Sequence, residues 1–291
     1  GNMKKSRTFD VVVIIMFAAL ALLTLYPFYN VIILSFSNTE SVAKHIPYLL
    51  PFALDLTGYK TIIQDSDFIN SLLVSLFVTI VGTAVNMVLS VIAAYVLSRK
   101  YLDGRNMIMS VIVFTMLFGG GLVPTYMVIK DMGLINKVWA MILPTAINTY
   151  YLIIMKNYFL GLPDGLFEAA KLDGAGEWTM LWKVAFPISK PIMATFTLFY
   201  AVDRWNEWYN ALLYINKKAL SPLQIYLRDI LTSLNSQLST QAQQMMGSTQ
   251  KVSTSAVQMA TIVITALPIM LVYPYLQKYF VNGVMVGGIK E

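Results

Sequence analysis

Long apolar stretches without a charged side chain dominate the sequence. Five of them contain no Asp, Glu, Lys or Arg: residues 11–39, 68–98, 106–129, 138–155 and 252–277. A helix that crosses a bilayer needs about 20 mostly apolar residues. Each stretch is therefore a candidate membrane span, and the pattern predicts an all-α membrane protein.

A sixth apolar stretch, residues 190–214, carries charge in its second half. It begins with the apolar run PIMATFTLFYAV and continues with Asp203, Arg204 and Glu207. Charged side chains at this depth are costly when they face lipid, so we expect them to face protein or water. With this stretch included, the sequence predicts six transmembrane helices, at about 11–36, 68–97, 107–129, 139–158, 190–214 and 257–278.

The distribution of basic residues suggests the orientation. The first apolar stretch is longer than the roughly 7–15 residues of a secretory signal, which favours a retained helix. A cytoplasmic N-terminus places twelve Lys and Arg residues in cytoplasmic segments and eight in outer loops, in agreement with the positive-inside rule. The inverted topology is the alternative.

On this basis we divide the chain into three parts: a cytoplasmic N-terminus at 1–10, a six-helix transmembrane domain at 11–279, and a cytoplasmic C-terminal tail at 280–291. The domain includes a cytoplasmic loop at 159–189. Two long outer segments, 37–67 and 215–256, are expected to cover the mouth of a pore or receive a soluble partner, or to be solvated connectors.

The composition narrows the function classes. Only 12% of the residues are charged and 57% are hydrophobic, whereas soluble domains have about 25% charged residues. These values argue against a disordered chain and a soluble enzyme. The sequence has no cysteine and a single histidine, His45, which excludes thiolate metal sites and argues against histidine-based catalysis. We attribute the net charge of +6 to cytoplasmic loops and not to binding of nucleic acid.

The loop at 159–189 contains the residues most typical of helix starts and helix ends. Pro163 and Asp164 are typical of a helix start, with Asp164 able to cap free N–H groups. Gly174 suits a left-handed helix end. We predict one short helix ending at Asp173-Gly174 and a second at about 176–183. The first helix could seat in a groove of another protein; a helix resting on lipid headgroups is the alternative.

The same loop resembles the EAA loop of bacterial ABC importer permeases. Its residues Glu168-Ala169-Ala170, Asp173-Gly174 and Phe186-Pro187 match that pattern in order and spacing, with Phe-Pro where Leu-Pro is usual. The segments WNEWYNALLY and KYFVNGVMVGGIKE are similar to the carbohydrate-uptake branch. Since the six-helix plan also matches, the resemblance covers essentially the whole chain.

The resemblance implies a type I importer fold in which this loop forms a coupling helix that docks into a cleft of a cytoplasmic ATPase. Glu168 would make the charged contact, the two alanines would allow close approach, and Gly174 would permit the sharp turn. The coupling residues carried over from the family are Glu168, Ala169, Ala170, Asp173, Gly174 and Pro187.

The resemblance also implies a function and partners. The chain would be the permease subunit of an ATP-driven importer for a sugar or oligosaccharide delivered by an extracytoplasmic binding protein. Its partners would be a second homologous permease, two ATPase subunits, that binding protein and membrane lipid, with no nucleic acid. It would lie in the bacterial plasma membrane with both termini cytoplasmic.

The sequence contains no nucleotide-binding motif of the form GxxxxGKS or GxxxxGKT. Gly119–Gly121 lies in an apolar span and is followed by Leu-Val-Pro, so a kink or close helix packing is the better account. We therefore expect no catalytic residue, metal or cofactor in this chain, which would not be an enzyme. ATP and Mg would be bound by the partner ATPase.

Polar and aromatic residues within the spans are candidates for the substrate path. They are Asn86, Tyr126, Asn148, Trp205, Asn206, Trp208, Tyr209 and Asn210. Aromatic faces and amides suit the C–H faces and hydroxyls of sugars, and hydrogen bonding between helices is the alternative for each residue. Asp203 and Arg204 are expected to form an internal ion pair.

Other functions remain open from the residues alone. An ABC permease for an amino acid or peptide would share the loop, although WNEWYNALLY argues against it. An ion-coupled secondary transporter would need internal repeats and a mid-membrane carboxylate relay, and no clear repeat is visible. A membrane scaffold protein, like the secondary transporter, has no reason to carry the EAA pattern.

Overall fold

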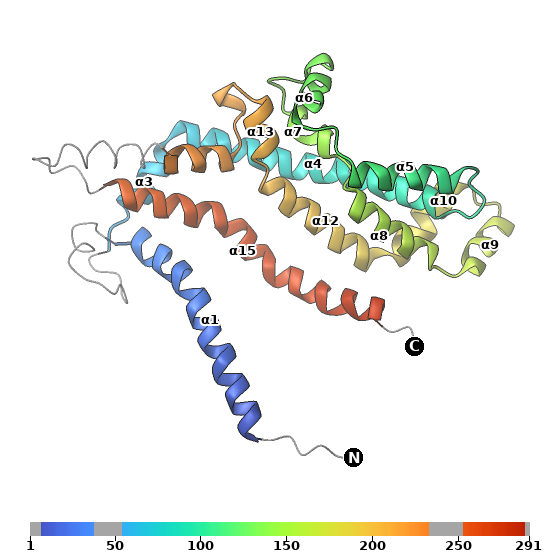
Figure 1. The fold of residues 1–291 in the computed structure, drawn as a ribbon, viewed down its shortest axis with the longest axis horizontal. Coiled ribbons are helices and arrows are strands. Elements are labelled where there is room, and N and C mark those ends of the chain that lie inside the picture. Colours follow the sequence, from blue (N-terminus) through green and yellow to red (C-terminus); the bar gives the residue numbers. More distant parts are fainter. Residues whose placement is uncertain (1–6, 38–53, 233–252, 289–291) are drawn as a thin grey trace, which may run out of the picture. The chain divides into compact units, whose positions relative to one another are not determined.

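The computed structural model describes residues 7–37, 54–232 and 253–288, which form helices joined by short connections (Figure 1). The all-α prediction is confirmed for these residues, which contain no strand beyond an isolated bridge between Ser37 and Leu54. His45 and most of the Ser- and Gln-rich outer loop lie outside the described residues, as do Lys4 and Lys5.

The chain divides into two compact units. The terminal unit comprises residues 1–68 and 227–268, with α1 (Arg7–Ser35) and α3 (Thr57–Gln64). The central unit comprises residues 69–226 and 269–291 and contains most of α4 (Ser66–Ser98). The last helix, α15 (Ser253–Gly288), contributes residues to both units.

Three of the predicted spans are continuous helices. The segments Phe9–Ser35, Ser66–Ser98 and Ala256–Pro274 are each long and apolar enough to cross a membrane. They correspond to the predictions at 11–36, 68–97 and 257–278. The last helix runs on to Gly288, so most of the predicted tail at 280–291 is helical.

The predicted span at 107–129 is broken in the middle. Helices α5 (Arg105–Leu117) and α6 (Leu122–Asp131) meet at an angle of 115°. Gly121 at this break has a φ of +84°, which favours glycine. A Cβ on Gly119 or Gly120 would meet nothing within 4 Å. The bend at Gly121 agrees with the predicted kink, and within the described ranges no helix packs closely against Gly119 or Gly120.

The predicted helix at 139–158 is wrong as a continuous element. It consists of α7 (Trp139–Ile142), the 3-10 turn Leu143–Thr145 and α8 (Thr149–Leu160). Asn148 is extended and its Oδ1 accepts the amide N–H groups of Tyr150 and Tyr151 at 3.0 and 3.3 Å. This side chain caps a new helix, because asparagine competes for backbone hydrogen bonds.

The predicted span at 190–214 is interrupted as well. It is formed by α12 (Lys190–Trp205) and α13 (Tyr209–Tyr214). Between them, the Glu207 carboxylate accepts the amide N–H of Asn210 at 3.0 Å, which satisfies a donor at the start of α13.

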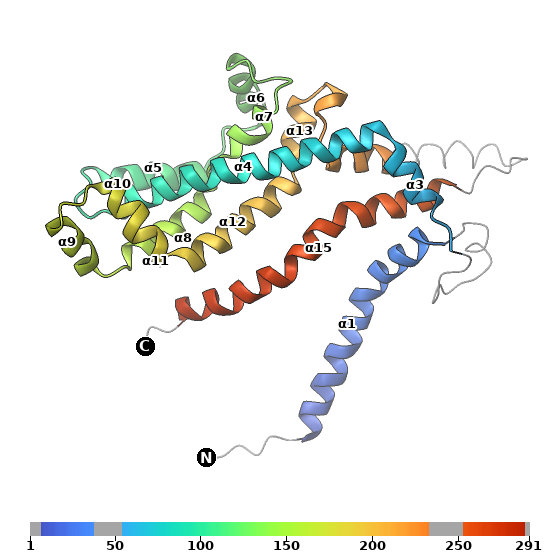
Figure 2. The same ribbon diagram turned by 180° about the vertical axis from the view of Figure 1, so that it is seen from behind.

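The buried core of the central unit is formed mainly by α4, α8 and α12, together with Phe167 and the stretch Met180–Ala185. Helix α5 adds only half-buried side chains. Figures 1 and 2 show α4 running along the unit with α5, α8 and α12 beside it. A hydrogen bond of 2.7 Å between the hydroxyls of Ser90 and Tyr200 joins α4 to α12. The buried side chains of the cluster include Val91, Ala94, Tyr95, Met155, Phe159, Phe167, Phe196 and Tyr200.

Candidate functional site

The loop at 159–189 folds as two short helical segments with a sharp turn between them. Helix α9 covers Asp164–Leu172, and α10 (Glu177–Thr179) continues through a π-helical stretch, Met180–Ala185, into α11 (Phe186–Ile188) with Pro187 in its first turn. Gly174 has a φ of +78°. The predicted helix pair and the left-handed glycine are confirmed.

The two alanines of the EAA motif lie on different faces of α9. Phe167 is buried, with 7% of its surface exposed, and Ala170 packs half-buried against the same core. Glu168 and Ala169 are exposed, as is Asp173. Ala169 is therefore accessible on the outer surface of α9, and Glu168 is accessible while also lining the pocket between α9 and the end of α4. Ala170 packs against the core.

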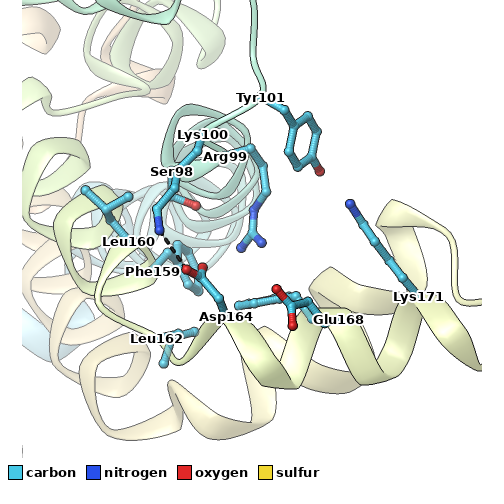
Figure 3. A pocket seen from close by; sticks show the side chains of 11 residues that line it. Ser98, Arg99, Lys100, Tyr101, Phe159, Leu160, Leu162, Asp164, Glu168 and Lys171 are labelled. Atoms are coloured by element: carbon cyan, nitrogen blue, oxygen red, sulfur yellow. Dashed lines mark hydrogen bonds and ion pairs between the residues drawn. The ribbon is translucent and has the colours of Figure 1, made fainter.

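A pocket of about 200 Å³ separates α9 from the C-terminal end of α4 (Figure 3). At its edge the Asp164 carboxylate accepts a hydrogen bond of 2.7 Å from the Lys100 ammonium. This contact and the Lys100 charge hold the pKa of Asp164 below its usual range. The expectation that Asp164 caps α9 is wrong: Pro163 occupies the N-cap without a side-chain bond, and the carboxylate turns to Lys100.

Arg99 joins α4 to α9 by stacking. Its guanidinium carbon lies 4.2 Å from the centroid of the Tyr95 ring and 3.9 Å from that of the Phe167 ring. A planar cation between two rings gains cation–π attraction on both faces, which a lysine could not match in geometry. Arg99 therefore fixes the buried face of α9 to the end of α4.

Glu177 makes a second connection between the loop and α4. Its carboxylate accepts hydrogen bonds from the hydroxyl of Tyr95, at 2.9 Å, and from that of Tyr101. The Lys171 ammonium lies 4.5 Å from the centroid of the Tyr101 ring, as Figure 3 shows. Both helical segments of the loop are thus attached to the same end of α4.

These contacts shift the pKa values of Glu177 and Tyr101. Burial acts to raise the pKa of Glu177, but the hydrogen bonds from Tyr101 and Tyr95 and the charges of Lys171 and Arg99 outweigh it and lower the pKa. Burial of the hydroxyl, followed by the bond to Glu177, raises the pKa of Tyr101 to about 12. At neutral pH the ionised carboxylate therefore accepts from neutral phenols.

This connection is expected to weaken in acid. The pKa of Glu177 is lower in the folded protein than in the unfolded chain. The contribution of Glu177 to the stability of the folded loop is therefore fully present above the pKa of an unfolded glutamate, about 4.3. It is lost as the pH falls through the folded pKa. We expect amide hydrogen exchange at 164–180, corrected for intrinsic rates, to rise between about pH 6 and pH 3.

The matched variants are Glu177→Gln and Asp103→Asn. Glu177→Gln should show the raised exchange already at pH 6 and little further change in acid. Asp103 is an exposed carboxylate in the connection between α4 and α5. The Asp103→Asn variant should show the same exchange as the parent protein at each pH. If the parent and Glu177→Gln exchange their amide hydrogens at equal rates at pH 6, the Glu177 carboxylate does not hold the loop to α4.

A second, polar cavity of about 590 Å³ lies in the central unit. It is lined by residues of α4, α5, the α7–α8 connection, α8, α12 and the α12–α13 connection: Asn86, Met116, Pro144, Thr145, Ile147, Asn148, Thr149, Tyr150, Tyr200, Asp203, Arg204 and Glu207. Two of the predicted substrate-path residues, Asn86 and Asn148, are brought together here.

Arg204 organises the wall of this polar cavity. Its side chain is 3% exposed and forms an ion pair of 3.5 Å with Glu207. Its Nη atoms donate to the carbonyls of Met141 and Thr145, both at 2.6 Å, and to Asn86 Oδ1 at 3.2 Å. The guanidinium thereby satisfies carbonyls that the break between α7 and α8 leaves without helical partners.

The expected ion pair between Asp203 and Arg204 is wrong. Arg204 pairs with Glu207, one helical turn further along the chain, and Asp203 instead accepts a hydrogen bond of 3.1 Å from the Tyr151 hydroxyl. Adjacent residues on a helix point in different directions, whereas residues three apart share a face.

Gly82 is a structural residue that the sequence analysis missed. A Cβ at this position would lie 2.9 Å from Arg204 Cδ, closer than packed carbon atoms approach. Glycine on α4 therefore makes room for the arginine side chain. A glycine within an apolar span was the available signal, since such residues often mark close approach of two helices.

The other predicted substrate-path residues lie elsewhere. Tyr126 stacks on Tyr214 with ring centroids 5.9 Å apart. Trp205 and Asn210 are buried, and Asn210 donates to Glu207 at 3.0 Å. The remaining three, Asn206, Trp208 and Tyr209, are exposed. None of these six residues lines the polar cavity.

The described ranges contain no group of three or more His, Cys, Asp or Glu residues arranged to hold a metal ion.

Comparison with known proteins gives a family and close relatives. The profile of the family described as "Binding-protein-dependent transport system inner membrane component" matches residues 10–286. Protein LplC of Bacillus subtilis strain 168 is 42% identical over 99% of this chain and 97% of its own. The polygalacturonan/rhamnogalacturonan transport system permease protein YtcP of the same strain is 42% identical over 98% of this chain and 99% of its own.

A solved structure is similar over the same range. A chain in the crystal structure of a bacterial ABC transporter that imports the acidic polysaccharide alginate superposes with a TM-score of 0.87. It is 32% identical, and the match covers 96% of this chain and 99% of that one.

Proposed function

The chain belongs to the family of binding-protein-dependent transport system inner membrane components, and from this premise we propose that it is the permease subunit of an ATP-driven importer of oligosaccharides. The observation that carries the sugar assignment is the 42% identity over nearly the full length of YtcP. The structural similarity to a chain of a bacterial ABC transporter involved in the import of alginate supports it.

We propose a set of partners from the same reasoning. Two cytoplasmic ATPase subunits would bind ATP and Mg, a second homologous permease would complete the pore, and an extracytoplasmic binding protein would deliver the sugar. Both termini would be cytoplasmic, with residues 1–10 and the tail 280–291 flanking the membrane domain at 11–279. The exposed Glu168 and Ala169 of α9 support an ATPase contact at 159–189.

The contacts of α9 suggest how ATPase closure would act on the pore. Arg99 and Glu177 attach the loop to the end of α4. Further along the same helix, Asn86 binds Arg204 in the wall of the polar cavity. A displacement of α9 would therefore move a helix that forms the cavity, and the cavity would open alternately to the two sides of the membrane.

Transport in proteoliposomes tests the proposal. The complete complex, with its binding protein, would be given ATP and labelled raffinose, arabinotriose or trigalacturonate. We expect ATP-dependent uptake of at least one saccharide and none of a labelled dipeptide. Uptake of the dipeptide alone, or saccharide uptake driven by a proton gradient without ATP, would contradict the proposal.

The isolated chain is expected not to bind or hydrolyse ATP, because its sequence has no phosphate-binding loop. Photolabelling of the purified chain by an azido-ATP analogue at micromolar concentration should remain at the background level of a sample with excess unlabelled ATP. The ATPase subunits in the complete complex are the positive control. Specific labelling of this chain would refute the expectation.

A further inference from the structure

The buried amide of Asn86 has a donor without a protein partner. Asn86 is 1% exposed and its Oδ1 accepts from the Arg204 guanidinium at 3.2 Å. Because arginine only donates hydrogen bonds, the oxygen of Asn86 must face it, which fixes the orientation of the amide. Its Nδ2 then has no partner among the described residues. A buried donor of this kind calls for an explanation, and a water or a ligand group bound at the cavity is one that fits its position.

A second amide at the same cavity is oriented by a different contact. The Oδ1 of Asn148 is committed to the amide N–H groups at the start of α8. Its Nδ2 is therefore the group that remains to bind a ligand. Asn86 and Asn148 both line the polar cavity, so the wall offers two amide donors whose oxygens are already in use.

Asp203 supplies the complementary acceptor. One of its oxygens accepts from the Tyr151 hydroxyl, its side chain is exposed, and it lines the same cavity. Glu207, the other carboxylate in the wall, is occupied by Arg204 and by the backbone and side-chain amides of Asn210. Asp203 is thus the carboxylate of this wall that can accept from a ligand.

The charge of Arg204 is already paired inside the protein. Both Nη atoms donate to carbonyls, Asn86 and Glu207, whereas the Nε is a buried donor without a partner among the described residues. An anionic ligand group in this cavity would face the Asp203 carboxylate, with the Arg204 charge offset by Glu207. A hydroxyl suits the wall better, because it donates to Asp203 and accepts from an amide at the same time.

We propose that Asn86, Asn148 and Asp203 form a saccharide-binding subsite in this subunit that takes the uncharged, hydroxyl-bearing face of the transported sugar. The exposed ring of Tyr150 in the cavity lining offers a surface for the C–H face of the same sugar. The volume of about 590 Å³ falls within the usual range of ligand cavities. This inference rests on the proposed function.

Equilibrium binding tests the subsite. The purified complex in lipid nanodiscs, without nucleotide, would be titrated with raffinose, arabinotriose and trigalacturonate. The variants are Asp203→Asn and Asn86→Leu, with Asp131→Asn as the matched control on an exposed aspartate outside the cavity. For each saccharide that the parent binds, we expect Asp203→Asn to weaken binding about tenfold, the effect of one charge-assisted hydrogen bond, and Asn86→Leu to weaken it by about fivefold, the effect of one neutral hydrogen bond.

Each outcome separates this subsite from the proposed function. Glu168→Lys should lower uptake but leave saccharide binding unchanged, because Glu168 lies at the proposed ATPase contact and does not line the cavity. If the complex takes up a saccharide and binding is unaffected by Asp203→Asn, the subsite is refuted while the proposed function stands. Tighter binding of trigalacturonate by Asp203→Asn would mean that the site takes a carboxylate, which also overturns it.

Misfolding is separated by a second measurement. Asp203→Asn should retain the thermal midpoint of the parent complex, and Tyr151→Phe should lower affinity less than Asp203→Asn. If Asp203→Asn weakens binding and also lowers the thermal midpoint, and Asp131→Asn does both to the same extent, the loss of binding is not specific to Asp203. That result would overturn the proposed contact between Asp203 and the saccharide. If no saccharide is taken up by the parent, the proposed function fails and the subsite with it.

Discussion

Glu168→Lys is expected to detach the ATPase subunits from the complex. Glu168 is exposed on α9, and in the proposed docked state it would lie at a largely desolvated contact. A reversed charge at such a contact costs about 2–5 kcal/mol, so association should weaken at least about 30-fold. Co-purification of the ATPase and saccharide-stimulated hydrolysis should both fall, while membrane insertion should be unaffected, since α9 lies outside the spans.

Ala169→Trp should have the same effect by steric exclusion. Ala169 is exposed beside Glu168, and a docked interface has little space for added atoms. Ala170→Trp is a different experiment, because Ala170 packs against the core of the central unit. It should lower the thermal midpoint of the permease itself.

Asp131→Lys provides the matched control for charge reversal. Asp131 is an exposed acid at the end of α6, away from the loop at 159–189, and its reversal should leave ATPase association at the parental level. A complex with Glu168→Lys or Ala169→Trp that keeps its ATPase subunits and full stimulated turnover would refute the coupling assignment.

Arg204→Met is expected to destabilise the permease more than any surface substitution. The change removes the charge partner of Glu207 and leaves the carbonyls of Met141 and Thr145 without the Arg204 donor. Removing one partner of a buried ion pair typically costs about 3–5 kcal/mol. The thermal midpoint of the detergent-solubilised protein should fall markedly, and the yield of assembled complex should fall with it.

One further variant tests the space around Arg204, and another serves as a control on an exposed arginine. Gly82→Val should be nearly as damaging, because a side chain at Gly82 meets Arg204 Cδ at 2.9 Å. Arg228→Met is the matched control: Arg228 is half exposed and its contact with Asp229 measures 3.9 Å, which contributes little. If the thermal midpoint of Arg204→Met lies within about 1–2 °C of that of Arg228→Met, the hydrogen bonds of Arg204 are not needed for the stability of the permease.

The continuous apolar stretches were predicted well because their physics is local. A run such as 68–98 has no charge to place in water, and a membrane span must satisfy its backbone within one helix. The turn at Gly174 was also predictable, since a left-handed residue at a helix end strongly favours glycine. The family pattern around Glu168 needed only residue types and spacing.

The interruptions within the spans were harder to predict. Asn148 and Glu207 each end a helical run by bonding backbone N–H groups of the helix that follows. Such side chains also occur within continuous helices, so the sequence does not reveal which alternative is adopted. The choice depends on whether another group, here Arg204, satisfies the carbonyls released at the break.

Residue types and their spacing were enough to predict the all-α membrane class, three continuous spans, the helix pair at 159–189 and the family. The packed helices were needed to show that Arg204 pairs with Glu207 and not with Asp203, that Ala169 and Ala170 have different surroundings, and that Asn86 and Asn148 line one cavity. The first set depends on interactions within about one helical turn or on the hydrophobicity of a whole segment. The second depends on contacts such as that of Arg204 with Asn86, 118 positions apart, whose geometry is fixed only when the helices pack.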